Sequence, residues 1–231
     1  MRLRMSPRLR LCSSRTRLKS LHILGQKCRC TLITIRGAVE MSVTRHGQQV
    51  WDVENAEPQE ARRHLKLSED GRTVSLEQDI KGGVFVCARA ELVRGCARAT
   101  VTVPKETATG DLDIGCVSAD GTRAWLYLGR AGERVEQRRA QSQWVDASER
   151  VQCGAPLLPE DRVAMELDLL PAQPRLIFTL NGRALPGAAA PPRGCAARFA
   201  VRLHVQGERA ELTHLNTDSV PSLRVATVPP T

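Results

Sequence analysis

Apolar and polar residues alternate along many short stretches of this chain, most clearly in its third quarter. Residues 175–180 (RLIFTL) place Leu, Phe and Leu on one side, the period of two that a strand with one buried face shows. Residues 162–169 (RVAMELDL) alternate in the same way. Asn181-Gly182 then follows, a dipeptide that accepts the positive φ of a two-residue hairpin turn. The pattern predicts neighbouring antiparallel strands.

Short strands of this style recur along the chain, and one helical turn is expected after Pro58. We expect residues 199–205 and 210–215 to pair with each other across Gly207 as a closing hairpin. Many short strands between Gly and Pro turns predict an all-β antiparallel sandwich. The other expected strands are 83–88, 96–103, 111–117 and 125–128, and the expected loops are 129–143 and 187–197.

Charge is distributed unevenly along the chain. Ten of the 34 Lys and Arg residues lie before Glu40, the first acidic residue, and the other 24 are matched by 25 acids. The formal charge of +9 therefore belongs to the N-terminal segment. We divide the chain into a basic, disordered leader at 1–38, a folded domain at 39–218 and a C-terminal tail at 219–231. We expect the leader to add nothing to the fold.

The leader leaves three interpretations open. It can be an inert extension, a mitochondrial transit peptide, because it is rich in Arg, Ser and Leu, or a basic tail that binds nucleic acid. The rest of the chain has no apolar run near the roughly 20 residues of a membrane span. We expect an intracellular, cytoplasmic monomer, or a mitochondrial one if the leader is a transit peptide. The folded domain is expected to bind neither nucleic acid nor membrane.

Patterns that carry catalytic chemistry are incomplete. Glu166-Leu167-Asp168 resembles the start of the E-x-D-x-E signature of jelly-roll glucanases, but Leu170 stands where the third acid would be. Retaining glycosidases need two carboxylates about 5–5.5 Å apart. Sugar sites also use aromatic platforms, and the chain has few aromatic residues: three Trp, three Phe and one Tyr. No nucleophile elbow or phosphate-binding loop is present in the sequence.

Metal-binding patterns are incomplete as well. The eight cysteines do not form the C-x₂₋₄-C pairs of zinc sites. His204 and His214 could face each other across the closing hairpin, but no third ligand accompanies them. Two surface imidazoles are therefore favoured over a metal pair. We expect no catalytic residue, no metal and no cofactor.

The order of the motifs resembles that of a SPRY domain over about residues 50–216. LSEDGRTV at 67–74 resembles the segment that opens the PRY-SPRY form, and GDLDIGCV at 110–117 resembles the Ile-Gly strand of the family. DRVAMELDL and LIFTLNG within 161–182 are similar to its paired central strands, and 199–215 resembles its closing hairpin. The resemblance implies a bent, concanavalin-like, SPRY-type β-sandwich that binds short protein segments through loops at one end.

The resemblance also indicates where a partner would bind. In the SPRY proteins that carry a SOCS box, a Tyr-bearing loop and a V-W-G turn grip peptides. The matching positions here are Trp125 or Tyr127, and Gln206-Gly207, with Gln206 in place of the family's Trp. Arg123 adds a cation beside these aromatic residues, and Arg and aromatic side chains dominate binding energy at many interfaces. We expect Arg123 and Gln206 to lie on one rim.

The sequence thus predicts a non-catalytic protein–protein interaction module whose partner is a protein or a short peptide. A lectin-like or glycosidase-like sandwich that binds carbohydrate is the alternative.

Overall fold

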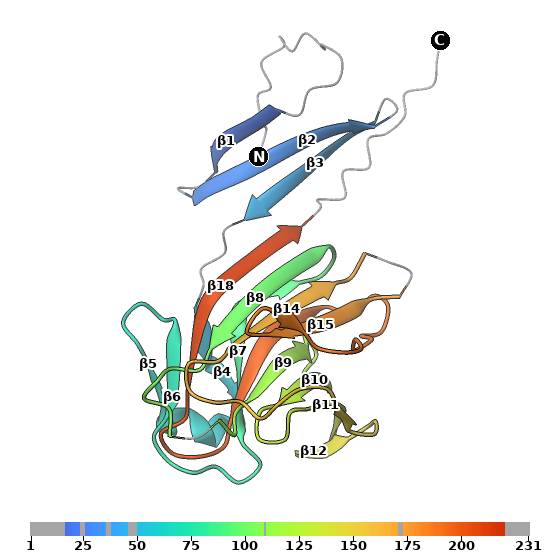
Figure 1. The fold of residues 1–231 in the computed structure, drawn as a ribbon. Helices are drawn as coiled ribbons and strands as arrows, with labels where there is room; N and C mark the ends of the chain where they lie inside the picture. The colour runs from blue at the N-terminus through green and yellow to red at the C-terminus, as the bar shows by residue number, and fades with distance from the viewer. Residues whose placement is uncertain are drawn as a thin grey trace, which may run out of the picture.

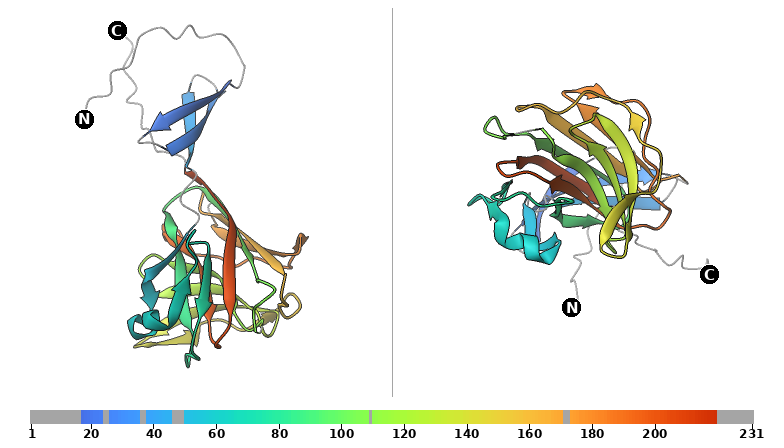
Figure 2. Two further views of the ribbon diagram at one scale, coloured as in Figure 1. Left: turned by 90° about the vertical axis from the view of Figure 1, so that its left-hand side faces the viewer. Right: turned by 90° about the horizontal axis from the view of Figure 1, so that it is seen from below.

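The structure is a computed structural model of the chain. It describes residues 17–23, 26–35, 38–45, 50–108, 110–170 and 173–219, with side chains from residue 50 to residue 216. Two antiparallel sheets form the bulk of this part (Figures 1 and 2), and the one short helix assigned within it is the 3₁₀ helix η1 (Gln59–His64). The all-β sandwich predicted from the alternating pattern is confirmed.

The larger sheet has the strand order β1-β2-β3-β18-β8-β14-β15-β16, and β6 and β5 join it through β18. Its strands are β1 (Arg17–Ile23), β2 (Gln26–Ile35), β3 (Ala38–Arg45), β5 (Leu65–Leu67), β6 (Thr73–Leu76), β8 (Cys96–Thr102), β14 (Arg162–Asp168), β15 (Arg175–Leu180), β16 (Arg183–Ala184) and β18 (Arg209–Ser219).

The smaller sheet has the order β12-β11-β10-β9-β17-β7-β4, and β13 pairs with β11. Its strands are β4 (Trp51–Glu57), β7 (Val84–Leu92), β9 (Asp113–Ser118), β10 (Arg123–Leu128), β11 (Glu133–Ala140), β12 (Gln143–Asp146), β13 (Val151–Gln152) and β17 (Ala197–Leu203).

The strands at residues 162–180 and their turn agree with the sequence prediction. β14 and β15 pair antiparallel from Val163↔Leu180 to Asp168↔Arg175. Asn181 and Gly182 have φ values of 49° and 81° and connect β15 to β16, so the primed turn is confirmed.

The main core lies between the two sheets. The alternating apolar positions of β14 and β15 point into it, and Met165, Leu167 and Phe178 are at most 1% exposed. The smaller sheet contributes Phe199 and Val201 from β17 to the same cluster. Burying a side chain of this size stabilises the fold by about 1.5–3 kcal/mol, so the alternating stripes hold the sheets together.

The prediction of a closing hairpin across Gly207 was wrong. β17 pairs with β7 and β9 in the smaller sheet, whereas β18 pairs with β8, β6 and β3 in the larger one. Alternation shows which side chains face the core, but both sheets face the same core, so the pattern cannot assign a strand to one sheet. His204 consequently follows β17 of the smaller sheet, whereas His214 lies within β18 of the larger one, so the two do not face each other across a hairpin.

The predicted loop at 129–143 contains a full strand. β11 occupies most of it and pairs with β10, β12 and β13. Its sequence, ERVEQRRA, has charged or amide side chains at most positions, and only Val135 and Gln137 are buried. The strand is held by its neighbours rather than by an apolar stripe, which explains why the sequence pattern misses it.

Part of the basic leader is assigned to strands. β1, β2 and β3 form an antiparallel meander, and β3 pairs with β18 at Thr217–Ser219. The division of the chain into a leader, a folded domain and a tail stays a prediction. Residues 1–16 and 220–231 lie outside the described residues. Among the described residues, no helix has the length and apolar character needed to cross a membrane.

Candidate binding site

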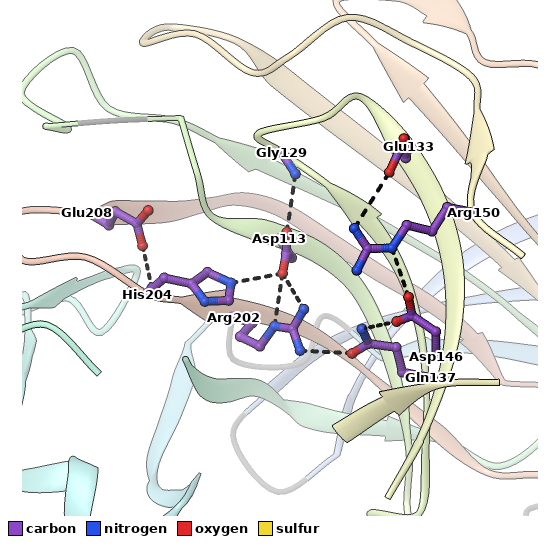
Figure 3. A network of polar contacts seen from close by, with 9 residues as sticks. All are labelled: Asp113, Gly129, Glu133, Gln137, Asp146, Arg150, Arg202, His204 and Glu208. Carbon is purple, nitrogen blue, oxygen red and sulfur yellow. Dashed lines mark hydrogen bonds and ion pairs between the residues drawn. The ribbon is translucent and has the colours of Figure 1, made fainter. Parts of the chain in front are cut away.

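The buried polar centre of the smaller sheet is an ion pair between two neighbouring strands. Asp113 begins β9 and lies opposite Arg202 of β17 in the strand register. Arg202 donates from Nε and Nη2 to Oδ2 of Asp113 at 2.9 and 2.6 Å, and Nε2 of His204 lies 2.9 Å from the same oxygen (Figure 3). The main-chain N–H of Gly129 donates to Oδ1 at 3.3 Å. The carboxylate of Asp113 is thus fully engaged.

The ion pair continues as a chain of polar contacts towards β12. Arg202 Nη1 donates to Gln137 Oε1 at 2.8 Å, and Gln137 Nε2 donates to Asp146 Oδ1 at 2.7 Å. Arg150 Nε donates to Asp146 Oδ2 at 2.8 Å, and its Nη1 lies 3.8 Å from Glu133 Oε2 (Figure 3). We call these residues, with Asp113 and His204, the Arg202 network. Because every member has a partner, the network fixes side chains from several strands.

An apolar cluster packs against the Arg202 network on the outer face of the smaller sheet. The guanidinium carbon of Arg202 lies 5.1 Å from the centroid of the Phe85 ring, within cation–π range. The Trp144 ring of β12 tilts over Phe85 with 4.9 Å between centroids. The face is therefore covered rather than solvated. Its other buried apolar members are Cys87, Val117, Ala124, Leu126, Leu128, Val135 and Ala200.

Two depressions flank the Arg202–His204 pair. The first, which we call the Trp144 depression, has a volume of about 500 Å³. The second is also lined by Arg202 and His204, has a volume of about 670 Å³ and includes Arg130 and Arg150. The Trp144 depression is lined by Glu57, Pro58, Lys81, Gly82, Gly83, Arg139, Ser142, Gln143, Trp144, Arg202 and His204.

The chain beyond His204 is held in a tight turn. Glu208 is completely buried, and its Oε2 accepts from the main-chain N–H groups of His204 and Val205 at 2.5 and 3.1 Å. The N–H of Gln206 donates to Oδ1 of Asp79 at 2.7 Å. These bonds fix the loop that borders both depressions.

The residues predicted to bind a partner are separated in the structure. Gln206 and Gly207 lie in the loop after His204, at the end of β17 that carries Arg202. Arg123 begins β10 at the opposite end of the sheet, where Ser118 pairs with Ala197. Arg123 is exposed and lies 3.3 Å from Glu136. The expectation that Arg123 and Gln206 share a rim was therefore wrong.

Trp125 and Tyr127 lie in the core between the sheets. Both side chains are 0% exposed, and the Tyr127 hydroxyl donates to the main-chain oxygen of Ala155. Burial raises the pKa of Tyr127 to about 12. In the strand register Trp125 lies opposite Cys116 and Tyr127 opposite Ile114 of β9, and all four side chains belong to the main core. They support the fold and do not present an exposed surface.

Asp113, Arg202 and Trp144 were not among the residues predicted from the sequence to form a site. Arg202 and His204 stand at the outward positions of an alternating strand, which normally means solvent exposure. The signal that could have found the cluster is Phe85, an aromatic residue in a fully apolar run of β7, because such a strand is buried on both faces.

The chemistry of the site favours binding. The Asp113 carboxylate accepts from several donors, so it is poorly suited to remove a proton from a substrate. Burial raises the pKa of the nearby Cys87 thiol to about 11, which disfavours a thiolate nucleophile. Within the described residues, no group of three or more His, Cys, Asp or Glu side chains is placed to hold a metal.

Comparisons with known proteins find similar folds. No family model and no curated protein matches the chain. The SPRY domain of human HERC1 is 15% identical with a TM-score of 0.48, covering 70% of this chain and 96% of that domain. The PSpry domain of TRIM65 is 13% identical with a TM-score of 0.45, covering 66% of this chain and 84% of that domain.

SPRY domains are among the solved structures to which the chain is similar. The carbohydrate-binding module CBM66 from Bacillus subtilis matches to the same extent. It is 10% identical with a TM-score of 0.47, covering 73% of this chain and 95% of the module. The choice between a protein ligand and a sugar therefore rests on the residues of this chain.

Proposed function

We propose that the chain is a non-catalytic interaction module that binds a segment of a partner protein in the Trp144 depression. The observation that carries this proposal is the lining of the depression, in which the partly exposed Trp144 stands beside the cations Lys81 and Arg139. Aromatic and Arg side chains contribute most of the binding energy at protein interfaces. Pro58 extends the apolar part of the wall.

The wall of the depression is rigid before a partner arrives. Arg202 is only 7% exposed and is fixed by Asp113 and Gln137, while Trp144 packs on Phe85. Groups that are already held in place lose little conformational entropy on binding. This preorganisation supports specific recognition by the folded domain.

The charges of the depression favour an acidic partner. Lys81, Arg139 and Arg202 line it, whereas Glu57 is the only carboxylate among its described lining residues and already pairs with Arg139. Lys81 is exposed and makes no ion pair among the described residues. A segment that carries Asp or Glu next to an apolar residue would match both the cationic rim and Trp144.

The test compares the proteins captured by the full chain and by charge variants. Lys81→Glu should lose the specific partner, because the substitution reverses the charge at the rim. Arg183→Glu is the matched control, since Arg183 is exposed on β16 of the other sheet. Both variants should keep the thermal midpoint of the wild type, as surface changes do. Identical sets of captured proteins for Lys81→Glu and the wild type would contradict the proposal.

A glycan array probed with the wild type, Trp144→Ala and Arg183→Glu tests the carbohydrate alternative. Binding of a defined glycan that is lost in Trp144→Ala and kept in Arg183→Glu would favour a carbohydrate ligand in this depression.

A further inference from the structure

A third pocket lies at an open edge of the sandwich, in the seam between the two sheets. It has a volume of about 390 Å³. Trp125 and Glu136, on neighbouring strands of the smaller sheet, form one side, and Ala188–Ala190, which follow β15 and β16 of the larger sheet, form the other. We call it the seam pocket. It shares no lining residue with the Trp144 depression.

A buried donor without a partner borders the seam pocket. Trp125 is 0% exposed, and its indole N–H has no hydrogen-bond partner among the described residues. Buried Trp side chains usually find a partner, and an unpaired buried donor costs about 1–3 kcal/mol. Trp51, by contrast, donates to the main-chain oxygen of Ala210 at 3.2 Å. An unpaired donor beside a pocket indicates a ligand with a hydrogen-bond acceptor.

The opposite wall offers an unpaired strand edge. Ala189 exchanges two main-chain hydrogen bonds with Leu176 of β15, at 2.9 and 2.8 Å. In such an antiparallel pair, the main-chain groups of the flanking residues point to the other side. Ala188 and Ala190 therefore turn their N–H and C=O groups away from β15, and these make no main-chain hydrogen bond among the described residues. An edge of this kind can pair with another chain.

The charged groups around the pocket leave one carboxylate for a partner. Glu136 lies 3.3 Å from Arg123, and Arg134 donates to the main-chain oxygen of Pro186 at 3.3 Å. Glu149 is exposed and forms no ion pair within the described part of the chain. The rest of the lining consists of Ser148, whose hydroxyl accepts from the main-chain N–H of Glu136, and of small apolar side chains from the alanines, Val135 and Val151.

We propose that the seam pocket binds an extended peptide segment of a partner protein, which adds as a short strand beside Ala188–Ala190. The segment pairs with the main chain of Ala188 and Ala190, and one of its carbonyl oxygens accepts from Trp125 Nε1 after the side chains that cover this atom in the free protein have moved. A Lys or Arg of the segment pairs with Glu149, and small side chains fill the rest of the pocket. The proposal is independent of the function assigned to the Trp144 depression.

The test uses random decapeptides displayed on phage and selected on the full chain. Peptides that carry a cation among small side chains should be enriched. Their affinity should fall at least about tenfold in Ala190→Pro, which removes one edge N–H, and in Glu149→Lys, a loss equivalent to about 1.4 kcal/mol. Glu69→Lys, at an exposed turn position that lines neither pocket, is the matched control and should bind as the wild type does. Thermal midpoints identify any variant that fails to fold.

Amide hydrogen exchange provides a second readout that needs no substitution. With a selected peptide bound, the amides of Ala188 and Ala190 should exchange more slowly, whereas that of Ala189, already bonded to Leu176, should change little. The proposal is overturned if no peptide is enriched, if exchange at Ala188 and Ala190 is unchanged, or if Glu69→Lys weakens binding while Glu149→Lys does not.

Discussion

At the level of a single residue, a substitution of Asp146 tests whether the Arg202 network stabilises the fold. Burial raises the pKa of this carboxyl, but the hydrogen bonds from Arg150 and Gln137 outweigh it, so its pKa lies below the usual 3.8. A carboxylate whose pKa is lower in the folded than in the unfolded state stabilises the fold above the unfolded value. That stabilisation is lost as the pH falls through the folded pKa.

We therefore expect Asp146→Asn to lower the urea midpoint at about pH 7, where the carboxylate is ionised in both states. The difference from the wild type should shrink as the pH falls below 3.8 and through the lower pKa of the folded state, because both proteins carry a neutral group below that pKa. Arg150→Gln removes the hydrogen bond from Arg150 to Asp146, so the folded-state pKa of Asp146 should rise towards 3.8. The stabilisation by Asp146 should then be lost at a higher pH than in the wild type. An equal difference at neutral and acidic pH would show that Asp146 acts through packing alone.

The turn between β15 and β16 carries a prediction at the level of the element. Gly182 has a φ of +81°, and a Cβ placed there would meet no atom within 4 Å. Gly182→Val therefore tests backbone strain without a clash, and it should destabilise the domain by about 1–3 kcal/mol. The measurement is the free energy of unfolding in urea. Ala184→Val, at an exposed strand position two residues on, is the control and should stay within about 0.5 kcal/mol of the wild type.

The same elements show what the sequence could predict. β8, β14 and β15 each have one buried apolar face, so the period of two locates them and assigns their inner residues. β11 was missed because its neighbours hold it by main-chain bonds and few of its side chains are buried. The partners of β17 and β18 were wrong because strands in either sheet carry the same alternation.

The candidate site was harder to predict for a related reason. Arg202 occupies an outward position of β17, and outward positions are normally solvated. Here β12 brings Trp144 over that face, so the position is buried and polar groups there must pair with one another. The pairing of Arg202 with Asp113 joins residues 89 positions apart, which no local pattern reveals.

At the level of the whole molecule, the question is how much of the chain the sandwich needs. Trp51 is the first member of the main core among the residues whose side chains are described. Before it, β3 contacts the sandwich through three register pairs with β18, from Arg45↔Thr217 to Val43↔Ser219. The smaller sheet, with the Arg202 network, has no strand from residues 17–45. These contacts are few beside the buried stripes of the two sheets.

We therefore expect deletion of residues 1–38, which removes β1 and β2, to shift the thermal midpoint by less than about 2 °C. Deletion of residues 1–49 also removes β3 and should give the same result, because the strands that remain keep every described member of the main core. Binding through Lys81 should be retained by both truncated chains. A thermal midpoint that falls by several degrees only in the longer deletion would show that the pairing of β3 with β18 stabilises the sandwich. A fall of this size in both deletions would show that the β1–β3 meander stabilises it as a unit.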